Sequence, residues 1–273
     1  MPTEIARAGS RWRPSPFVAA SIVLHLAALA AWPLRPAWGP ALLALLVLDN
    51  LVLTACGLLP RSRWLGPNLT RLPAAAAARG EIALTIDDGP DPEVTPAVLD
   101  LLDRYQARAT FFCIGERAQR YPQLCREIVA RGHAVENHSQ RHRHAFALMG
   151  MGGFRRELRE AQHTLAAITG QVPAFFRAPA GIRSPLLDPV LPGLGLRLAS
   201  WTRRGFDTRT ADTALLLRRL GDNLRAGDIL LLHDGNAART AGGQPVILEV
   251  LPRLLEQAAA AGLRTVTLRT AHA

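Results

Sequence analysis

Lysine is absent from this chain, cysteine and aromatic residues are scarce, and no nucleotide-binding glycine motif is present. All 32 basic residues are arginine, which we attribute to codon bias because the two residue types serve equally on most solvated surfaces. Three cysteines, Cys56, Cys113 and Cys125, do not describe a disulfide framework, and buried thiols are favoured over a Cys113–Cys125 bridge. No Gly-x-Gly-x-x-Gly follows an expected strand, so nothing supports dinucleotide binding.

The positive charge is concentrated at the amino-terminal end. The chain has 273 residues and a net charge of +10, and residues 1–80 carry eight arginines against only Glu4 and Asp49. A membrane surface explains this excess better than a nucleic acid does. The sequence also lacks a stripe of aromatic and basic residues that would bind single strands, so we expect no nucleic-acid partner.

Two long apolar segments precede the rest of the chain. Residues 17–34 contain no formal charge and would span about 27 Å as a helix, and residues 41–59 are interrupted only by Asp49 and Asn50. The proline-containing link 35–40 suits a helical hairpin, so we predict two transmembrane helices within residues 1–60. A cleaved signal peptide is the alternative, but the second apolar segment argues against it.

The flanking arginines predict how this hairpin is oriented. Three lie before the first segment, Arg35 lies in the link, and four follow the second segment before residue 80. The positive-inside rule therefore favours the cytoplasmic side of a bacterial-type inner membrane for both ends and for the remaining chain. Within the hairpin, Asp49 lies at about the depth of His25, and we expect these two residues to form a hydrogen bond.

Residues 81–273 alternate short β-rich runs with helical patterns, which predicts parallel strands with right-handed crossovers. The expected strands are 82–86, 109–114, 133–136, 174–177, 196–201, 228–233 and 263–268. The expected helices include 94–105, 116–131, 154–169, 211–224 and 246–261. The fold class is therefore α/β, as an open sheet or a closed barrel, and residues 61–80 are interpreted as a linker.

Polar residues gather at the carboxyl ends of these strands. Asp87 and Asp88 end the first, His138 follows the third, Arg177 ends the fourth, Asp207 follows the fifth and His233 ends the sixth. Parallel α/β barrels assemble active sites on this face.

Asp88 can combine with His138 and His142, whose spacing can place both imidazoles on one face of a helical turn. Two imidazoles and one carboxylate form a ligand set for Zn²⁺, with Co²⁺, Ni²⁺ or Mn²⁺ as alternatives. Such a set leaves positions open for water and substrate, which predicts metal-assisted hydrolysis.

At these residues the sequence resembles the NodB-homology polysaccharide deacetylase family. The resemblance extends from Glu81 to the C-terminus and rests on motifs in the family's order. They are Thr85-Ile-Asp-Asp-Gly-Pro90, His138-Ser-Gln-Arg-His142, Arg177-Ala-Pro-Ala-Gly181, residues 201–207 and Leu231-Leu-His233. It implies a distorted (β/α)₇ barrel preceded by the two transmembrane helices, and a metal-dependent N-deacetylase activity.

The resemblance also assigns roles. Asp88, His138 and His142 would bind one divalent metal ion, and Asp87 would be the general base. His233 would protonate the leaving amine. Arg177 would orient Asp87, and Asp207 would raise the pKa of His233. Near the substrate, a backbone N–H at Ala180 would stabilise the oxyanion, and Trp201 would either contact the substrate or fill the barrel.

Three positions depart from the family pattern. Arg143 stands where a proline often follows the second metal-binding histidine, Ala180 replaces an aromatic residue, and Thr208 replaces a tryptophan. No catalytic side chain is lost, so these changes affect the expected specificity and not the expected reaction.

The expected substrate is an N-acylated amino sugar of a glycan or glycolipid at the membrane, and no obligate protein partner is evident. If the site faces the cytoplasm, a lipid-linked amino sugar that carries an acetyl or formyl group is the preferred alternative. An inactive metal-containing module that recognises glycans is an alternative of another class.

Overall fold

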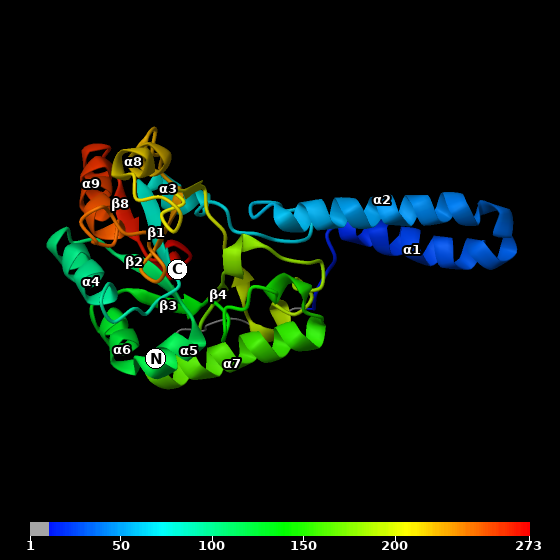
Figure 1. Cartoon of the computed structure of the whole chain (residues 1–273), viewed down its shortest axis with the longest axis horizontal. Coiled ribbons are helices and arrows are strands. Elements are labelled where there is room, and N and C mark those ends of the chain that lie inside the picture. Colours follow the sequence, from blue (N-terminus) through cyan, green and yellow to red (C-terminus); the bar gives the residue numbers. More distant parts are fainter. Residues whose placement is uncertain (1–10) are drawn as a thin grey trace.

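A twisted sheet of parallel strands organises the larger part of the molecule (Figure 1). The computed structural model describes residues 11–273. The sheet has eight strands in the order β5-β4-β3-β2-β1-β7-β6, with β8 paired to β1. They are β1 (Glu81–Asp87), β2 (Ala109–Cys113), β3 (Ala134–Asn137), β4 (Phe175–Phe176), β5 (Arg197–Leu198), β6 (Arg203–Arg204), β7 (Ile229–His233) and β8 (Arg264–Val266).

This arrangement confirms the predicted α/β class with parallel strands and forms a half-barrel. The seven expected strands are all present, several of them shortened, and β6 is an eighth that the sequence did not predict. Its two residues, Arg203 and Arg204, are both charged and give no strand signal. It pairs in parallel with β7, where Arg204 lies opposite Leu231.

Helices lie between most of the strands and cover the outer face of the sheet (Figure 1), whereas the short helices before β1 and after β8 pack with residues of its inner face. The helices are α3 (Ala74–Ala78), α4 (Thr95–Arg104), α5 (Gly115–Arg120), α6 (Pro122–Ala130), α7 (Met151–Thr169), α8 (Thr213–Gly221), α9 (Ile247–Ala260) and α10 (Leu268–Ala271). The single helix expected over 116–131 was wrong, because the chain breaks at Tyr121 and a new helix starts at Pro122. Proline has no N–H to continue the first helix but suits the start of the second.

Strand β1 is buried along its whole length and divides its side chains between two environments. Ile82, Leu84 and Ile86 belong to the apolar core that includes residues of α4 and α9. Ala83 packs with residues of β2 and β7 on the other face, the interior of the half-barrel. Because alternate residues of a strand point to opposite faces, Thr85 and Asp87 share the inner face.

The segment expected to be a linker lies against the half-barrel. Leu69 donates its N–H to the Leu198 carbonyl at 2.9 Å and accepts from the Ser200 N–H at 2.8 Å, so it extends the pairing beside β5. Leu72 donates to the Gly227 carbonyl at 2.8 Å. This segment is therefore an extended connection that is held in place, and not a free tether.

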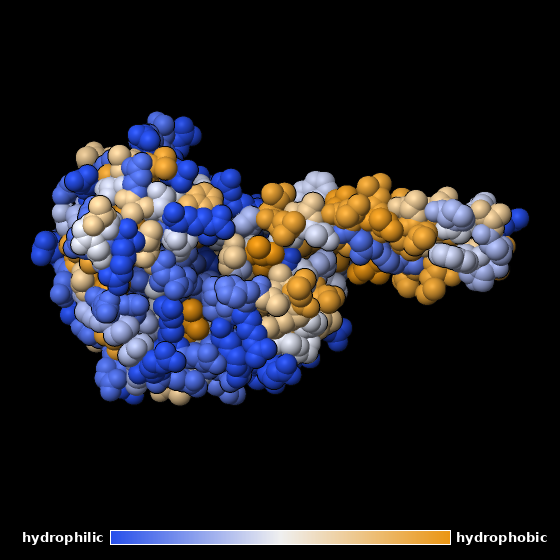
Figure 2. Space-filling model, in the orientation of Figure 1, coloured by the Kyte–Doolittle hydropathy of each residue, from blue (hydrophilic) through white to orange (hydrophobic). Residues whose placement is uncertain are grey.

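Helices α1 (Pro16–Leu34) and α2 (Gly39–Leu58) form a hairpin that projects away from the half-barrel (Figure 1), joined by a short 3₁₀ turn over Pro36–Trp38. Ser15 caps α1 by accepting the Val18 N–H. Figure 2 shows the apolar surface of the projecting part. Both helices are long and apolar enough to cross a membrane.

Polar residues inside the hairpin pair differently from the prediction. Asp49 accepts a hydrogen bond from the Ser21 hydroxyl at 2.6 Å, whereas His25 Nδ1 lies 3.7 Å from Asp49. His25 Nδ1 instead donates to the Ser21 carbonyl at 2.9 Å. The expected Asp49–His25 hydrogen bond was wrong, because Ser21, one turn before His25 on α1, lies closer to the Asp49 carboxylate and donates to it.

The base of the hairpin is attached directly to the half-barrel. Gly57 of α2 accepts the Arg183 N–H at 3.1 Å, and Trp12 Nε1, ahead of α1, donates to Asp188 at 2.8 Å. The loop that carries Arg183 and Asp188 follows β4. The hairpin therefore contacts the part of the chain that continues from Arg177.

Candidate metal centre and active site

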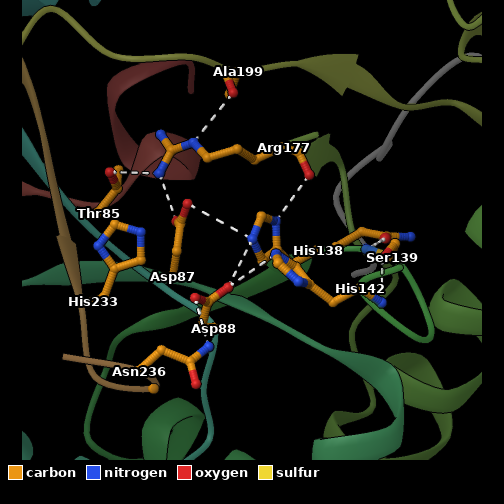
Figure 3. A network of polar contacts seen from close by, with 12 residues as sticks. Thr85, Asp87, Asp88, His138, Ser139, His142, Arg177, Ala199, His233 and Asn236 are labelled. Carbon is orange, nitrogen blue, oxygen red and sulfur yellow. Dashed lines mark hydrogen bonds and ion pairs between the residues drawn. The ribbon is translucent and has the colours of Figure 1, made fainter. Parts of the chain in front are cut away.

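The predicted site residues meet at the carboxyl ends of the strands (Figure 3). Asp87 is the last residue of β1, and Asp88 follows it with a left-handed backbone conformation, φ 71°. Two adjacent carboxylates would repel each other if they faced the same point. The turn at Asp88 separates them, so that Asp88 faces the two histidines and Asp87 faces Arg177.

Asp88, His138 and His142 form a set of three converging ligand atoms. Asp88 Oδ1 lies 3.2 Å from Nε2 of His138 and 3.2 Å from Nε2 of His142. The three atoms lie within 4.8 Å of one another. The prediction that these side chains come together is confirmed by their positions.

The chemistry of this donor set fits a divalent cation. Asp88 Oδ1 is buried and has no hydrogen-bond partner, so it needs a positive charge. His138 Nδ1 lies 2.9 Å from the Arg177 carbonyl, which can only accept, and this bond leaves Nε2 free as a ligand. Burial lowers the pKa of His142 to about 4, so its ring is neutral at neutral pH and can offer Nε2 as a ligand.

The chain between the two histidines is a loop and not the helical turn that their spacing suggested. Ser139 and His142 both have positive φ values, 64° and 47°. The Ser139 hydroxyl accepts the His142 N–H at 3.0 Å, and the Ser139 N–H donates to the Asn137 side chain at 2.9 Å. These two local hydrogen bonds replace helical ones and hold His142 opposite Asp88.

Asp87 is held by a buried arginine. Arg177 Nη1 donates to Asp87 Oδ1 at 2.7 Å and to the Thr85 hydroxyl at 2.8 Å. Asp87 Oδ2 is left 3.9 Å from His138 Nε2, beside the metal ligands. Asp87 therefore has one oxygen fixed by Arg177 and the other directed into the site.

Arg177 itself is only 1% exposed and is enclosed on all sides. Its remaining donors reach the carbonyls of Ser200 at 2.7 Å and Ala199 at 3.2 Å, and its guanidinium lies 4.2 Å from the centre of the Phe112 ring. Burial lowers the pKa of Arg177, which the charge of Asp87 opposes. A planar group with five donors is suited to this position, and a lysine could not reproduce these bonds.

His233 and Asp207 form the second buried pair. Asp207 Oδ1 lies 2.8 Å from His233 Nδ1, and Asp207 Oδ2 accepts the His233 backbone N–H at 2.7 Å. Burial alone would lower the pKa of His233, but the charge of Asp207 and its hydrogen bond raise it above the usual value. His233 thus directs Nε2 toward the site as a potential proton donor.

The two predicted substrate contacts have different surroundings. Ala180 is exposed and has a left-handed backbone, φ 56°, within the short 3₁₀ segment Pro179–Gly181. Trp201 is 6% exposed, and its ring centre lies 5.8 Å from the guanidinium of Arg177 and 5.1 Å from that of Arg204. A role for either residue in substrate binding stays a prediction.

Two further residues hold Asp88 in place and were not predicted. Asn236 Nδ2 donates to Asp88 Oδ2 at 3.0 Å, which leaves Oδ1 for the histidines. Arg117 donates to the Asn236 side-chain oxygen at 3.2 Å and to the Asp88 carbonyl at 2.8 Å. Asn236 follows β7 by three residues, and this position at the carboxyl end of a strand could have marked it as a site residue. Arg117 lies on α5, and nothing in the sequence around it indicated a role at the site.

The part of the chain that forms this site is similar to known deacetylases. A family model described as polysaccharide deacetylase matches residues 75–199. Over 198 residues the chain is 34% identical to a peptidoglycan-N-acetylglucosamine deacetylase of Bacillus cereus, a match that covers 68% of this chain and 85% of the relative. It is 39% identical over 160 residues to a chitooligosaccharide deacetylase of Azorhizobium caulinodans, covering 58% of this chain and 75% of the relative.

Solved structures are similar in the same region. A family 4 acetyl xylan esterase of Clostridium thermocellum, solved in complex with a cobalt ion, superimposes with a TM-score of 0.62 and 28% identity, covering 70% of this chain and 89% of that one. The residues matched by the family model include Asp87, Asp88, His138, His142 and Arg177.

Proposed function

Because the chain belongs to the polysaccharide deacetylase family, we propose that it is a metal-dependent hydrolase that removes the N-acetyl group from an amino sugar of a glycan or glycolipid. One observation carries the proposal. A buried, unpaired Asp88 oxygen faces two imidazole nitrogens at 3.2 Å each, while the adjacent Asp87 is held apart by Arg177. Metal binding and acid–base chemistry are thereby assigned to different carboxylates.

Asp88, His138 and His142 would hold the cation. Zn²⁺ is our first choice for two imidazoles and one carboxylate, and Co²⁺, Ni²⁺ and Mn²⁺ are alternatives. When bound, such an ion polarises the amide carbonyl and lowers the pKa of a water molecule at the site. Asn236 and Arg117 would keep the Asp88 carboxylate in the orientation that this requires.

Asp87 would act as the general base. Its Oδ1 is fixed by Arg177, so Oδ2 is the oxygen that takes a proton from the attacking water. Arg177 would hold Asp87 in place through a short, charge-assisted hydrogen bond. The backbone N–H of Ala180 would donate to the oxyanion that develops on the former carbonyl oxygen.

His233 would act as the general acid. The leaving amine must receive a proton before it departs, and Asp207 raises the pKa of His233 so that the imidazole begins in its protonated form. Asp207 would also hold the ring in one orientation. Trp201 would form a wall of the site, beside Arg177.

We place the enzyme at a bacterial-type inner membrane, anchored by α1 and α2. The two helices are long and apolar enough to span, and apolar side chains cover the projecting part of the hairpin. A signal sequence would pass the same length test for α1 alone, but α2 is a second helix of the same kind. The distribution of arginines favours the cytoplasmic side for the active site.

Acetate release tests the proposed reaction. The full-length protein, purified in detergent and supplied with each of the four metals in turn, is expected to release acetate from N-acetylated chitooligosaccharides or peptidoglycan. Asp87→Asn is expected to lower the rate about 10²- to 10⁴-fold while retaining bound metal, and His142→Ala is expected to lose the metal. If the protein released neither acetate nor formate from any N-acylated sugar with any of these metals, an inactive glycan-recognition module would replace our proposal.

A further inference from the structure

A strongly basic cavity of about 760 Å³ lies next to the site, between β6 and the segment that leaves α2. Six arginines and a single carboxylate line it. The arginines are Arg61, Arg71, Arg203, Arg204, Arg219 and Arg225, and the carboxylate is Asp228. Such an excess of one charge around a cavity attracts anions.

The protein itself neutralises only part of this charge. Asp228 is shared by Arg71 and Arg203, at 2.8 Å each. Within residues 11–273, the other four arginines form no ion pair with a carboxylate, and Arg61 and Arg219 donate to backbone carbonyls. The cavity therefore retains several uncompensated guanidinium groups.

Arg204 connects the cavity to the catalytic site. Its guanidinium lies 5.1 Å from the ring centre of Trp201 and 4.8 Å from that of Phe206, and its Nε is buried without a hydrogen-bond partner. The Trp201 ring centre also lies 5.8 Å from the guanidinium of Arg177. One tryptophan thus lies beside both the arginine that holds Asp87 and an arginine that forms no ion pair. A half-buried cation without a partner is costly unless an anion binds to it.

The cavity also lies at the base of the hairpin. Pro60 and Arg61, which line it, follow α2 after an interval of only one residue. If α1 and α2 span a membrane, this point is at the level of the lipid headgroups. A phosphate carried by a membrane lipid would therefore lie at the depth of the cavity. The cavity adjoins the catalytic site through Trp201, which lines it and lies beside Arg177.

We propose that the arginine-lined cavity binds a phosphate or diphosphate group of the substrate, and that the substrate is an N-acylated amino sugar joined through this group to a membrane lipid. The inference rests on the proposed function and specifies its substrate class. Arginine suits this task because its planar guanidinium binds phosphate oxygens in pairs. A neutral glycan would leave these cations without a ligand.

Turnover of matched substrates provides the first test. The full-length holoenzyme in detergent would be given an N-acetylated amino sugar on a short polyprenyl diphosphate, the same sugar on a nucleoside diphosphate, and a neutral chitooligosaccharide. We expect kcat/KM to be at least tenfold higher for the lipid-linked sugar than for the other two. Equal turnover of the lipid-linked and neutral substrates would overturn the proposal and leave the deacetylase function intact, and a preference for the nucleotide sugar would overturn the assignment to a lipid.

Charge removal tests the location of the phosphate. Arg204→Gln, and separately the double change Arg61→Gln with Arg225→Gln at two exposed positions, should lower the preference for the lipid-linked sugar about tenfold or more. Arg63→Gln is the matched control, since Arg63 is exposed at the same end of the hairpin but lines a different cavity. An equal loss in the control would assign the effect to general attraction by the membrane surface and overturn the proposal.

Binding without turnover keeps the two proposals distinguishable. Asp87→Asn protein is expected to bind the lipid-linked sugar in micelles, and adding Arg204→Gln should weaken this binding about tenfold, whereas adding Arg63→Gln should not. If binding followed this pattern but no variant released acetate from any substrate, the proposed reaction would be wrong and the phosphate site would stand. Binding that is unaffected by Arg204→Gln would reject the phosphate site whatever the catalytic result.

Discussion

At the scale of single residues, the site depends on how each ligand is oriented by a neighbour. Asp88 has two oxygens, and the hydrogen bond from Asn236 to Oδ2 determines which of them faces the histidines. Arg117 in turn binds the Asn236 oxygen, so the amide can present only its N–H₂ to Asp88. Removing such a support usually weakens metal binding about 10- to 100-fold without removing a ligand.

Asn236→Ala is therefore expected to lower the affinity for Zn²⁺ or Co²⁺ at least tenfold, measured by competition with a chelator of known affinity. At saturating metal its kcat should return toward that of the unaltered protein. Gln123→Ala removes an exposed amide from the outer helix α6 and serves as the control, with no expected change. Unaltered metal affinity in Asn236→Ala would show that Asp88 needs no such support.

The His233–Asp207 pair predicts a specific pH dependence. A general acid must be protonated, so activity falls as the pH rises through its pKa. Asp207 raises the pKa of His233, which keeps the acid protonated to higher pH. Asp207→Asn removes the negative charge, so the descending limb of the kcat–pH profile should move to lower pH. A descending limb that did not move would exclude His233 as the acid.

The clustering of the proposed site residues was predictable because parallel strands present their carboxyl ends on one face. Asp87, Asp88, His138, Arg177 and His233 were all located by this rule, and their proximity is confirmed. The loop geometry that sets the His138–His142 pair was not predictable from spacing. This loop geometry depends on local hydrogen bonds made by the side chains of Ser139 and Asn137. Serine and asparagine side chains could form such bonds at many positions in a sequence, so their presence alone does not predict the loop.

At the scale of elements, the junction between α2 and the half-barrel leaves no room for a side chain. A Cβ on Gly57 would collide with the Arg183 carbonyl, while the Gly57 carbonyl accepts the Arg183 N–H at 3.1 Å. Glycine inside a helix normally costs about 0.5–1 kcal/mol relative to alanine. Its presence here is explained by the close approach of two backbones.

Gly57→Ala should therefore destabilise the protein, against the usual effect in a helix. We expect a loss of at least about 1 kcal/mol in the free energy of unfolding, seen as a lower Tm in detergent. Gly152→Ala is the matched control, because a Cβ at this position of α7 has nothing within 4 Å, and it should leave the Tm unchanged or raise it. A Gly57→Ala protein as stable as the control would mean that the hairpin and half-barrel are not joined at this point.

The elements differ in how strongly the local sequence marks them. Helices such as α7 and α9 have enough turns for an apolar periodicity, and β1 and β7 have enough residues for a buried run. Strand β6 is formed by Arg203 and Arg204, whose charge gives no strand signal, and it exists because β7 offers an edge for pairing. The pairing of Leu69 beside β5 has the same origin. Both are consequences of tertiary contacts that no local pattern records.

At the scale of the whole molecule, the hairpin returns to its starting side. Gly57, at the end of α2, and Trp12, before α1, both bind the loop after β4, so the two ends of the hairpin lie together against the half-barrel (Figure 1). If both helices span, the half-barrel and residues 11–15 are on one side of the membrane and the link at Pro36–Trp38 is on the other. The arginines that flank the helices then decide which side is which.

The cytoplasmic side is predicted for the half-barrel, because three arginines precede α1 and four follow α2 before residue 80, against Arg35 alone in the link. Alkaline phosphatase, which is active only outside the cytoplasm, is expected to be inactive when fused after Ala273 and active when fused after Trp38. The opposite pair of results would contradict the prediction, and the active site could then act on polymeric glycan of the cell wall. With the expected result, an N-acylated sugar must reach Asp88 from the cytoplasmic face, where a phosphate-linked lipid can carry it to the arginine-lined cavity.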